Sequence, residues 1–416
     1  MYTHHSLSLY RRNIVLLYVF QATSHLWFDG ALWVIYWQHR GVSLFVIGLL
    51  EALLHLVSLT LDIPMGIVAD RVGWKYTLFL SGLAGCLYCG LSLLPSDTLF
   101  GAFAAFACRG LQLTLASGSD MAITYETVAA AGYSSRYQSI SGRMMATQLL
   151  AVGFAEACGG WLAGIDWTYV YGLFAIANLV SAGGALLLAM PNRQRAVADL
   201  TGEAPLSFVQ MIRTSAQFAR RNASYRRWVT FGAILSGAIS TCTFYGQSFL
   251  HACGWTTGAV GMLTGIECGV SALAAAGSSR ITQWLRVPGI AAVTAGGMAL
   301  FAWLPPAGKG IGYLLAQATG SAADPLIDQR LNTILPNAVR ATLLSGNSTA
   351  FSLFMVIVFP SFGLLADQIG TETAYQACSA ILAAAVAVTV LLWIGLQLRR
   401  GKGCASVPSE SLDDER

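Results

Sequence analysis

The stretch GIVADRVGWKYTL, residues Gly66 to Leu78, places Asp70, Arg71 and Lys75 between two long apolar segments. The whole chain has 416 residues, of which 55% are hydrophobic and only 11% are charged. Soluble domains carry about 25% charged residues, so this chain has too few charges to cover a water-exposed surface. The apolar segments therefore indicate membrane-spanning helices, and the quoted stretch indicates a polar connection between two of them.

Apolar stretches of about 20 residues, the length that crosses a bilayer, recur along the chain. The first one has no small-residue cleavage site after it, so we interpret it as a retained span and not as a signal peptide. We predict twelve spans, at residues 14–37, 44–68, 75–94, 98–119, 138–163, 168–190, 228–250, 256–279, 288–304, 309–328, 342–366 and 372–398.

Basic residues are distributed unevenly over the loops of this topology. Only Arg40 and Lys309 fall on one side, and the other loop lysines and arginines fall on the side of the N-terminus. Loops rich in Lys and Arg stay in the cytoplasm. We therefore expect a multi-pass protein of the cell (inner, cytoplasmic) membrane with both termini in the cytoplasm.

The polar stretch near the middle of the sequence divides the chain into two halves. We expect a six-helix N-terminal half at 1–190, a cytoplasmic linker at 191–227, a six-helix C-terminal half at 228–400 and a polar tail at 401–416. Apolar residues at helical spacing in the linker favour an amphipathic helix at the membrane surface. A solvated linker is the alternative.

Three short stretches of the first half recur in the second half in the same order. They are Gly41 to Gly48 with Gly254 to Gly261, ASGSD (116–120) with ATGSA (318–322), and RYQSISGR (136–143) with RATLLSGN (340–347). Internal symmetry in a membrane protein is typical of transporters built from repeated halves. The fold class that we predict is all-α, with twelve transmembrane helices in two pseudo-symmetric six-helix halves.

The opening stretch resembles the loop signature of the major facilitator superfamily, Gly-x-Leu-Ala-Asp-Arg-x-Gly-Arg-Lys-x-x-Leu. Trp74 stands where the signature has a basic residue, and GLLADQIG (363–370) echoes the motif in the second half. Pro64 and SGSD (117–120) resemble the drug-and-metabolite efflux branch of that superfamily. The signature residues present are Gly66, Ala69, Asp70, Arg71, Gly73, Lys75 and Leu78.

The resemblance implies a cytoplasmic gate formed by Gly66, Asp70, Arg71, Gly73, Lys75 and Asp120. The two glycines allow close packing and a sharp turn. Asp70 is expected to lie against a helix N-terminus of the other half, where a carboxylate is stabilised by about 0.3–2 kcal/mol. A simple cytoplasmic turn is the alternative. In the fifth span, Ala155 and Glu156 stand where the antiporter motif has Gly-Pro, which weakens the inference of antiport.

Ionisable side chains inside spans cost about 2.5–3.5 kcal/mol on insertion scales and are candidates for function. His25 and Asp29 are four residues apart, as are Glu51 and His55, so each pair is expected on one helical face. Two orientations remain as alternatives for Glu51, one toward the cavity and one toward span 11. His25, taken by itself, fits a hydrogen-bonding helix contact. The candidates for proton coupling or for the cavity are Asp29, Arg109, Glu51, His25, Glu156 and Glu267.

The resemblance also implies that the first and fourth spans of each half line a central cavity, so Asp29 and Arg109 are expected to face it. We predict a secondary active transporter that exports a drug or a metabolite, such as a siderophore, in exchange for protons. A proton-coupled uptake permease is the alternative, and a membrane acyltransferase is a remote one because His25 and Asp29 fit an HxxxD pattern. We expect a monomer that has the bilayer, the substrate and protons as partners, and no cofactor, metal or nucleic acid.

A reporter enzyme that is active only outside the cytoplasm tests the predicted topology. We expect a fusion after Ala198 to be inactive, because the linker is cytoplasmic. A fusion after Ser96, in the predicted outer loop between spans 3 and 4, is the control and is expected to be active. Activity of the Ala198 fusion would contradict the twelve-span topology.

Overall fold

The structure is a computed structural model that describes residues 4–94, 99–117, 119–189, 208–335, 340–381 and 384. All regular structure in these ranges is helical. Residues 371–381 form a further helical stretch. The helices are α1 (His4–Ser24), α2 (Trp33–His39), α3 (Leu44–Val72), α4 (Trp74–Leu93), α5 (Leu99–Ala116), α6 (Ser119–Ala130), the short 3-10 helix η1 (Ser134–Arg136), α7 (Tyr137–Ala163), α8 (Trp167–Leu186), α9 (Phe208–Arg221), α10 (Ala223–Ala252), α11 (Thr257–Ala276), α12 (Ser278–Trp303), α13 (Pro306–Ile334) and α14 (Arg340–Ile369).

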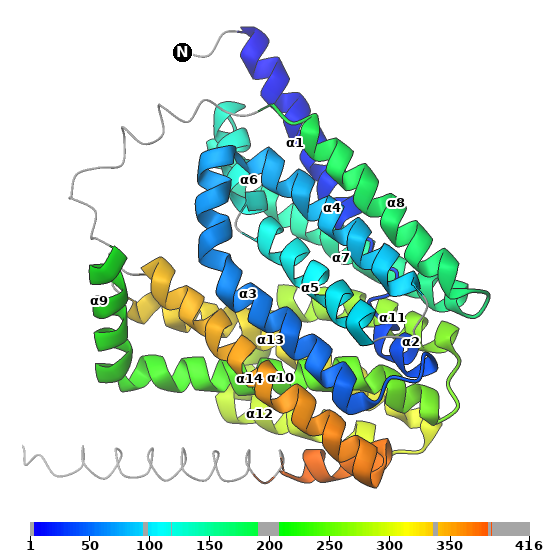
Figure 1. Cartoon of the computed structure of the whole chain (residues 1–416). Helices are drawn as coiled ribbons and strands as arrows, with labels where there is room; N and C mark the ends of the chain where they lie inside the picture. The colour runs from blue at the N-terminus through cyan, green and yellow to red at the C-terminus, as the bar shows by residue number, and fades with distance from the viewer. Residues whose placement is uncertain are drawn as a thin grey trace, which may run out of the picture.

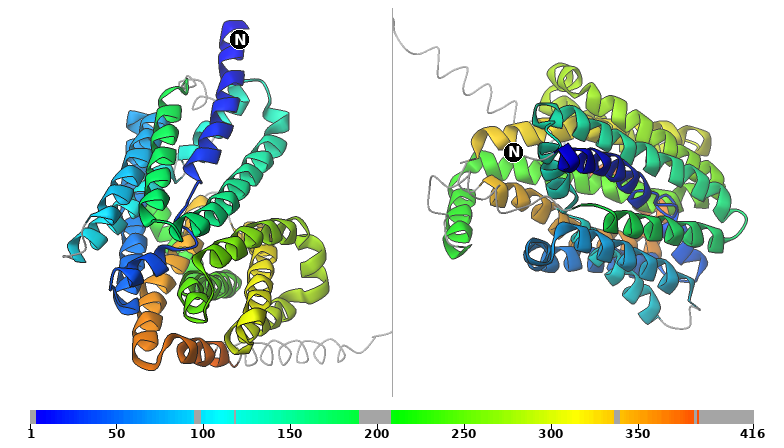
Figure 2. Two further views of the ribbon diagram at one scale, coloured as in Figure 1. Left: turned by 90° about the vertical axis from the view of Figure 1, so that its right-hand side faces the viewer. Right: turned by 90° about the horizontal axis from the view of Figure 1, so that it is seen from above.

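The helices form two groups that correspond to the two halves of the sequence. Figure 1 shows most of α1 to α8, in blue to green, above α10 to α14, in green to orange, with α2 and the start of α3 reaching down beside the second group. The side view in Figure 2 shows the two groups from another direction. The most extensive contacts between the halves are those of α3 with α14 and of α7 with α11. These two contacts are the seams along which the halves meet.

The predicted spans agree with the helices at most places. Eight helices in the described ranges are long and apolar enough to cross a membrane. The prediction of the first span as a single helix is wrong, because residues 25–32 separate α1 from α2. The ninth span is part of α12, which is kinked at Arg286 (φ 54°) two residues before Pro288. The linker up to residue 207, the tail and most of span 12 lie outside the described residues.

Local sequence determines where several helices begin. Four helices start at a polar side chain that accepts a hydrogen bond from a first-turn N–H, which stabilises a helix by about 1 kcal/mol. These N-caps are Ser43 for α3, Asp166 for α8, Asn222 for α10 and Thr256 for α11. Gly73 has a φ of 104° and makes the turn between α3 and α4.

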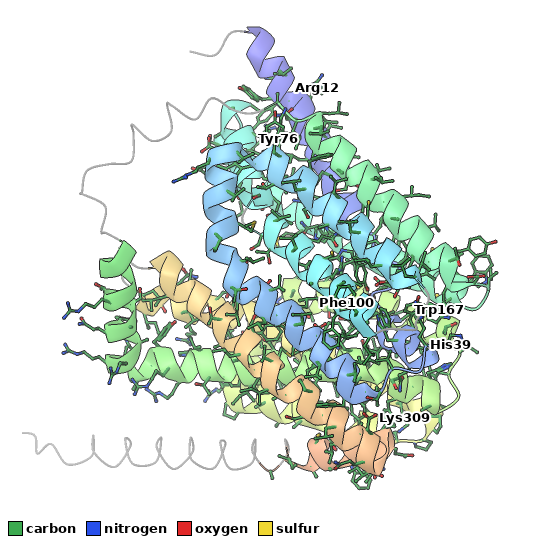
Figure 3. All side chains as sticks on the ribbon, in the orientation of Figure 1. Arg12, His39, Tyr76, Phe100, Trp167 and Lys309 are labelled. Atoms are coloured by element: carbon green, nitrogen blue, oxygen red, sulfur yellow. The ribbon has the colours of Figure 1, made fainter. Side chains whose placement is uncertain are left out.

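The two halves are joined at one end of the bundle, where α3 begins and α14 ends; we call it the closed end. The opposite end, where α3 ends and α9 lies, is the linker end. Tyr245 Oη on α10 donates to Leu44 O over 3.1 Å and lies 2.9 Å from Phe359 O. Farther along α3, His55 is hydrogen-bonded to Ser352 of α14. Figure 3 labels His39 and Lys309 at the closed end.

The seam between α7 and α11 is built from glycines on both helices. A Cβ on Gly160 would lie 2.9 Å from Gly261 Cα, and a Cβ on Gly265 would lie 2.8 Å from Gly153 O. Backbones therefore touch without intervening side chains, as small residues at four-residue spacing allow. Gly269, the third glycine of this spacing, meets no atom within 4 Å, so it takes no part in the seam.

A substitution at Gly159 tests how tightly α7 packs against the break of the first span. A Cβ on Gly159 would lie 1.8 Å from Phe28 O, in the break of the first span. We expect Gly159→Ala to force a backbone shift and to lower the free energy of unfolding by about 1–3 kcal/mol. Gly172→Ala on α8 is the control, because a Cβ there meets nothing within 4 Å. Thermal unfolding in detergent measures both variants, and equal melting temperatures would contradict the close approach.

Candidate functional site

The break in the first span, residues 25–32, is the centre of the candidate site. Gln247 of α10, which is 1% exposed, holds it from the other half. Gln247 Nε2 donates to Gly30 O over 2.9 Å, and Val34 N donates to Gln247 Oε1 over 3.4 Å. Backbone groups outside a helix need such partners in apolar surroundings. The break is therefore stabilised by tertiary contacts that span the two halves.

Asp29 lies inside this break and is 3% exposed. Tyr88 Oη on α4 donates to Asp29 Oδ2 over 2.5 Å. Arg109 lies 5.6 Å from the centre of the same Tyr88 ring, and no salt bridge joins Asp29 and Arg109, both of which the structure describes. Tyr88 is a site residue that sequence reasoning missed, because nothing in an apolar span signals a partner 59 residues away.

Arg109 on α5 lies among aromatic rings within the N-terminal half. Its guanidinium carbon is 4.8 Å from the centre of the Trp27 ring and 5.1 Å from that of Phe174. It is also 5.6 Å from the ring of Tyr88. Arg109 Nη1 donates to Gln112 Oε1 over 2.8 Å. Asp29 and Arg109 thus both contact Tyr88, and these partners of Arg109 all belong to its own half.

His25 does not pair with Asp29, so the acid–imidazole pair predicted for the first span is wrong. Its Nδ1 lies 2.9 Å from Gln21 O and 3.1 Å from Ser24 Oγ. Its ring stacks on Trp27 with a centroid distance of 5.5 Å. The predicted spacing required a continuous helix, and the helix ends at Ser24. His25 makes the local hydrogen-bonding contact that the sequence left as the alternative.

Glu51 and His55 form the pair expected from their spacing on α3. His55 Nε2 lies 3.6 Å from Glu51 Oε1, and both side chains are buried. His55 Nδ1 lies 3.2 Å from Ser352 Oγ on α14, and the His55 ring contacts Phe351 edge-on. Of the two orientations left open for this face, the structure has the one toward span 11. The pair therefore lies in the seam between the halves.

Glu156 and Glu267 lie at the other seam and come from different halves. Glu156 on α7 lies against the break, where a Cβ on Gly30 would be 2.7 Å from its Oε1. Cys268 Sγ on α11 is 4.0 Å from Glu156 Oε2. Ser271 Oγ donates to Glu267 Oε1 over 2.5 Å. The structure thus brings Glu156 against Gly30, the chain neighbour of Asp29, whereas Glu267 is bonded to Ser271 on its own helix.

The predicted gate residues lie at the linker end. They are Gly66, Asp70 and Arg71 on α3, Gly73 at the turn, Lys75 on α4 and Asp120 in the first turn of α6. Among the described residues, a Cβ on Gly66 would meet no atom within 4 Å, so they do not provide the close packing expected there. Trp74 is buried in an apolar cluster with Leu78. The side chain of Asp70 lies outside the described residues, so its latch stays a prediction.

Asp367, in the GLLADQIG echo at the end of α14, joins the two halves at the closed end. Its Oδ1 accepts from Leu44 N over 3.0 Å and its Oδ2 accepts from Phe45 N over 2.8 Å. These N–H groups belong to the first turn of α3, where a carboxylate is favoured by the helix dipole. This is the arrangement that we expected for Asp70, found at the opposite end of the bundle.

Lys309, predicted to lie in an outer loop, is instead 2% exposed in the first turn of α13. Its Nζ donates to Phe301 O and Ala302 O at the end of α12, over 3.3 and 3.2 Å. It also lies 4.2 Å from the centre of the Phe249 ring. A cation is favoured at a helix C-terminus, so Lys309 stabilises the closed end of the C-terminal half.

A cavity of about 330 Å³ lies among α10, α12, α14 and residues 371–381. Its walls are mostly apolar and include Met298, Phe354 and Phe362. Among the described residues, no charged side chain lines it, and none of the predicted site residues does. Ile381, the last residue of the described range 340–381, is one of the residues that line it. We therefore place the candidate site at the break of the first span and not in this cavity.

Comparison with known proteins agrees with the fold described above. Residues 14–318 match the Major Facilitator Superfamily. The fold is similar to that of the nucleoside transporter NupG (TM-score 0.71, 15% identity, 91% of this chain and 98% of that chain). It is also similar to a D-xylose-proton symporter (TM-score 0.65, 15% identity, 91% and 96%) and to a POT family transporter in complex with a thioalcohol-conjugated peptide (0.66, 13%, 92% and 96%).

A search of curated protein sequences finds no match. The family match covers most of the chain, so the protein belongs to the Major Facilitator Superfamily. It is an all-α, multi-pass membrane protein and a secondary transporter of small molecules. It is not an enzyme, and the acyltransferase reading of His25 and Asp29 is set aside.

Asp367 is expected to hold the closed end together. Asp367→Asn keeps the shape of the side chain but removes its charge, and the two N–H groups of α3 lose a charged acceptor. We expect the closed end to open more often, so that a cysteine introduced at Phe45 reacts several-fold faster with a membrane-impermeant maleimide, with the native cysteines replaced. Glu372→Gln, an exposed acid nearby, is the control. Equal labelling rates in all three backgrounds would contradict the latch.

Proposed function

We propose that the protein is a proton-coupled transporter that moves a small organic molecule by alternating access. The observation that carries the proposal is the buried carboxylate of Asp29, bonded to Tyr88 beside Arg109 in the break of the first span. An ionised carboxylate in low dielectric costs several kcal/mol unless it is paired. Arg109 neutralises Asp29 in one state and a proton does so in the other, which gives the two states different proton affinities.

The contacts between the halves support alternating access. Asp367 binds the start of α3 at the closed end, and His55 binds Ser352 farther along the same seam. His55 is about 17 Å from Leu44 along α3, at 1.5 Å per residue. Because the basic loops lie at the linker end, we place that end and both termini in the cytoplasm. The state described here is then the one that opens toward the cytoplasm.

In the opposite state we assign the latch to the loop between α3 and α4. Asp70 would then bind a helix N-terminus of the other half, as Asp367 does at the closed end. Trp74 removes one basic partner from this loop, so Arg71 or Lys75 has to supply the pairing. The two acids would act alternately, each holding one end of the bundle shut.

Export in exchange for protons is the direction that we propose, supported by the resemblance of Pro64 and SGSD (117–120) to the efflux branch. A drug or a metabolite such as a siderophore fits this direction. Uptake with protons is the second candidate, favoured by the similarity to a protein named as a D-xylose-proton symporter. The sign of the proton movement that a substrate drives distinguishes the two directions.

Asp29→Asn tests the coupling. Purified protein in vesicles loaded with a pH-sensitive dye is offered a panel of nucleosides, dipeptides, sugars and organic amines, and any compound that moves protons is then used. We expect the variant to lose substrate-driven proton movement at least tenfold while downhill exchange continues, because an amide cannot carry the proton. Arg109→Ala is expected to reduce substrate-driven proton movement further than Asp29→Asn does, since it leaves Asp29 buried without its cation.

Asp62→Asn on α3 is the control, because this acid is exposed and far along the helix from Glu51. It is expected to retain both proton movement and exchange. Full proton movement by Asp29→Asn would show that another acid carries the proton, and Glu51 and Glu156 would be tested next.

A further inference from the structure

The α3–α14 seam contains a histidine that contacts polar groups of both halves at once. His55 Nε2 lies 3.6 Å from Glu51 Oε1, one turn earlier on α3, and His55 Nδ1 lies 3.2 Å from Ser352 Oγ on α14. The imidazole also packs edge-on against Phe351, with 5.5 Å between the ring centres. His55 therefore bridges the two halves, and it loses Ser352 when α3 and α14 separate.

The seam beside this pair is closed by a backbone contact. Glu51 and His55 are both buried. One turn toward the closed end, a Cβ on Gly48 would lie 2.6 Å from Pro360 Cα, so the backbones of α3 and α14 touch there. Figure 1 shows α3, in blue, beside α14, in orange, along this contact. Water from the closed end therefore reaches the pair only when the halves separate.

The charge of the pair depends mainly on its own two groups. Among the described residues, no lysine or arginine forms an ion pair with Glu51. The other charged or titratable groups on helices around α3 have partners of their own or lie near helix ends. They are Arg109, which donates to Gln112, Tyr245, which donates to Leu44 O, Asp367, which accepts from Leu44 N, and, near helix ends, His39, Lys75 and Arg340.

The pair holds a different number of protons when the seam is closed and when it is open. In low dielectric a net charge on the pair is disfavoured, so Glu51 and His55 together hold one proton in the closed seam. In water at about pH 7.5 a glutamate is ionised and a histidine is mostly neutral, so the separated pair holds none. Closing the seam therefore takes up one proton.

The sign of the pH dependence follows from this proton count. The closed seam holds more protons than the open one, so acid favours the closed seam, by up to about tenfold per pH unit. Below about pH 6.5 the separated histidine takes up a proton as well, and the two states then hold equal numbers. The equilibrium is therefore expected to depend on pH above this value and to level off below it.

We propose that Glu51 and His55 form a proton-operated latch that holds α3 against Ser352 of α14. The latch proton enters and leaves at the closed end, so it controls how often the halves separate there. It is distinct from the proton that Asp29 carries across the membrane. This inference rests on the alternating access of the proposed function and adds its regulation by pH.

Two spin labels across the closed end test the latch. Cysteines replace His39 on α2 and Thr373 after α14, two exposed residues of opposite halves, in the full chain with the native cysteines replaced. Figure 3 labels His39 at this end. Pulsed electron paramagnetic resonance in lipid nanodiscs gives the distances between the labels from pH 5 to pH 8.5. We expect a short and a long distance, with a ratio of short to long that is constant up to about pH 6.5 and falls up to about tenfold per pH unit above it.

Two substitutions assign the effect to the pair, because Asp29 also titrates in the proposed cycle. Glu51→Gln cannot take up the proton, so the rise of the ratio on acidification is expected to disappear. His55→Gln removes the group that charges in the separated state, so the ratio is expected to keep rising down to about pH 5, near the ordinary range of a glutamate. A purely structural role of His55 would not move this break to lower pH.

Two further variants serve as a test of the bridge and as a control. Ser352→Ala removes the partner on α14, so we expect a several-fold shift toward the long distance at every pH with the break still near pH 6.5. Asp62→Asn is the matched control, because it neutralises an exposed acid on the same helix. It is expected to keep the unmodified profile.

The outcomes separate this latch from the proposed function. If both distances are present but the break near pH 6.5 is missing, or stays in place in His55→Gln, the latch is overturned and alternating access stands. The unmodified pair and His55→Gln are sufficient for this decision if Glu51→Gln does not fold. A single distance at every pH in all variants would overturn the latch and the proposed alternation together.

Discussion

The hydrogen bonds between Gln247 and the broken first span are the contacts on which the rest of the site depends. A chain segment that leaves the helical conformation inside an apolar bundle must find partners for its N–H and C=O groups. Gln247 supplies both an acceptor and a donor, to Val34 and Gly30. The break directs Asp29 toward Tyr88, and Gly159 allows α7 to approach Phe28. A movement of α10 would therefore act, through Gln247, on the segment that holds Asp29.

The two halves are similar in sequence pattern, yet their contacts are concentrated at one end. Asp367, Tyr245 and the glycines of α7 and α11 hold the closed end through backbone contacts and charge-assisted hydrogen bonds. Such contacts are short-ranged, so they are lost together when the halves rotate. This makes the closed end a switch with two arrangements and not a flexible joint.

The buried acids differ in what surrounds them, and this separates their roles. Asp29 has its partners Tyr88 and Arg109 in its own half. Glu51 lies with His55 against α14, so its surroundings change when the α3–α14 seam opens. Glu156 and Glu267 are on the helices of the second seam, and neither forms an ion pair with a described residue. The buried acids thus respond differently to one movement of the halves, because some of them lie at a seam and others do not.

The sequence by itself determined the membrane class, most helix positions, the two halves and the loop signature, because apolar length, basic loops and N-caps are local properties. It also determined the spacing of Glu51 and His55, which a regular helix preserves. Only the tertiary structure decided the break at 25–32, the loss of the pairing between His25 and Asp29, the burial of Lys309 and the partners Tyr88 and Gln247. The physical reason is that a break inside a membrane helix is stable only when distant residues satisfy its backbone, and no local pattern encodes those residues.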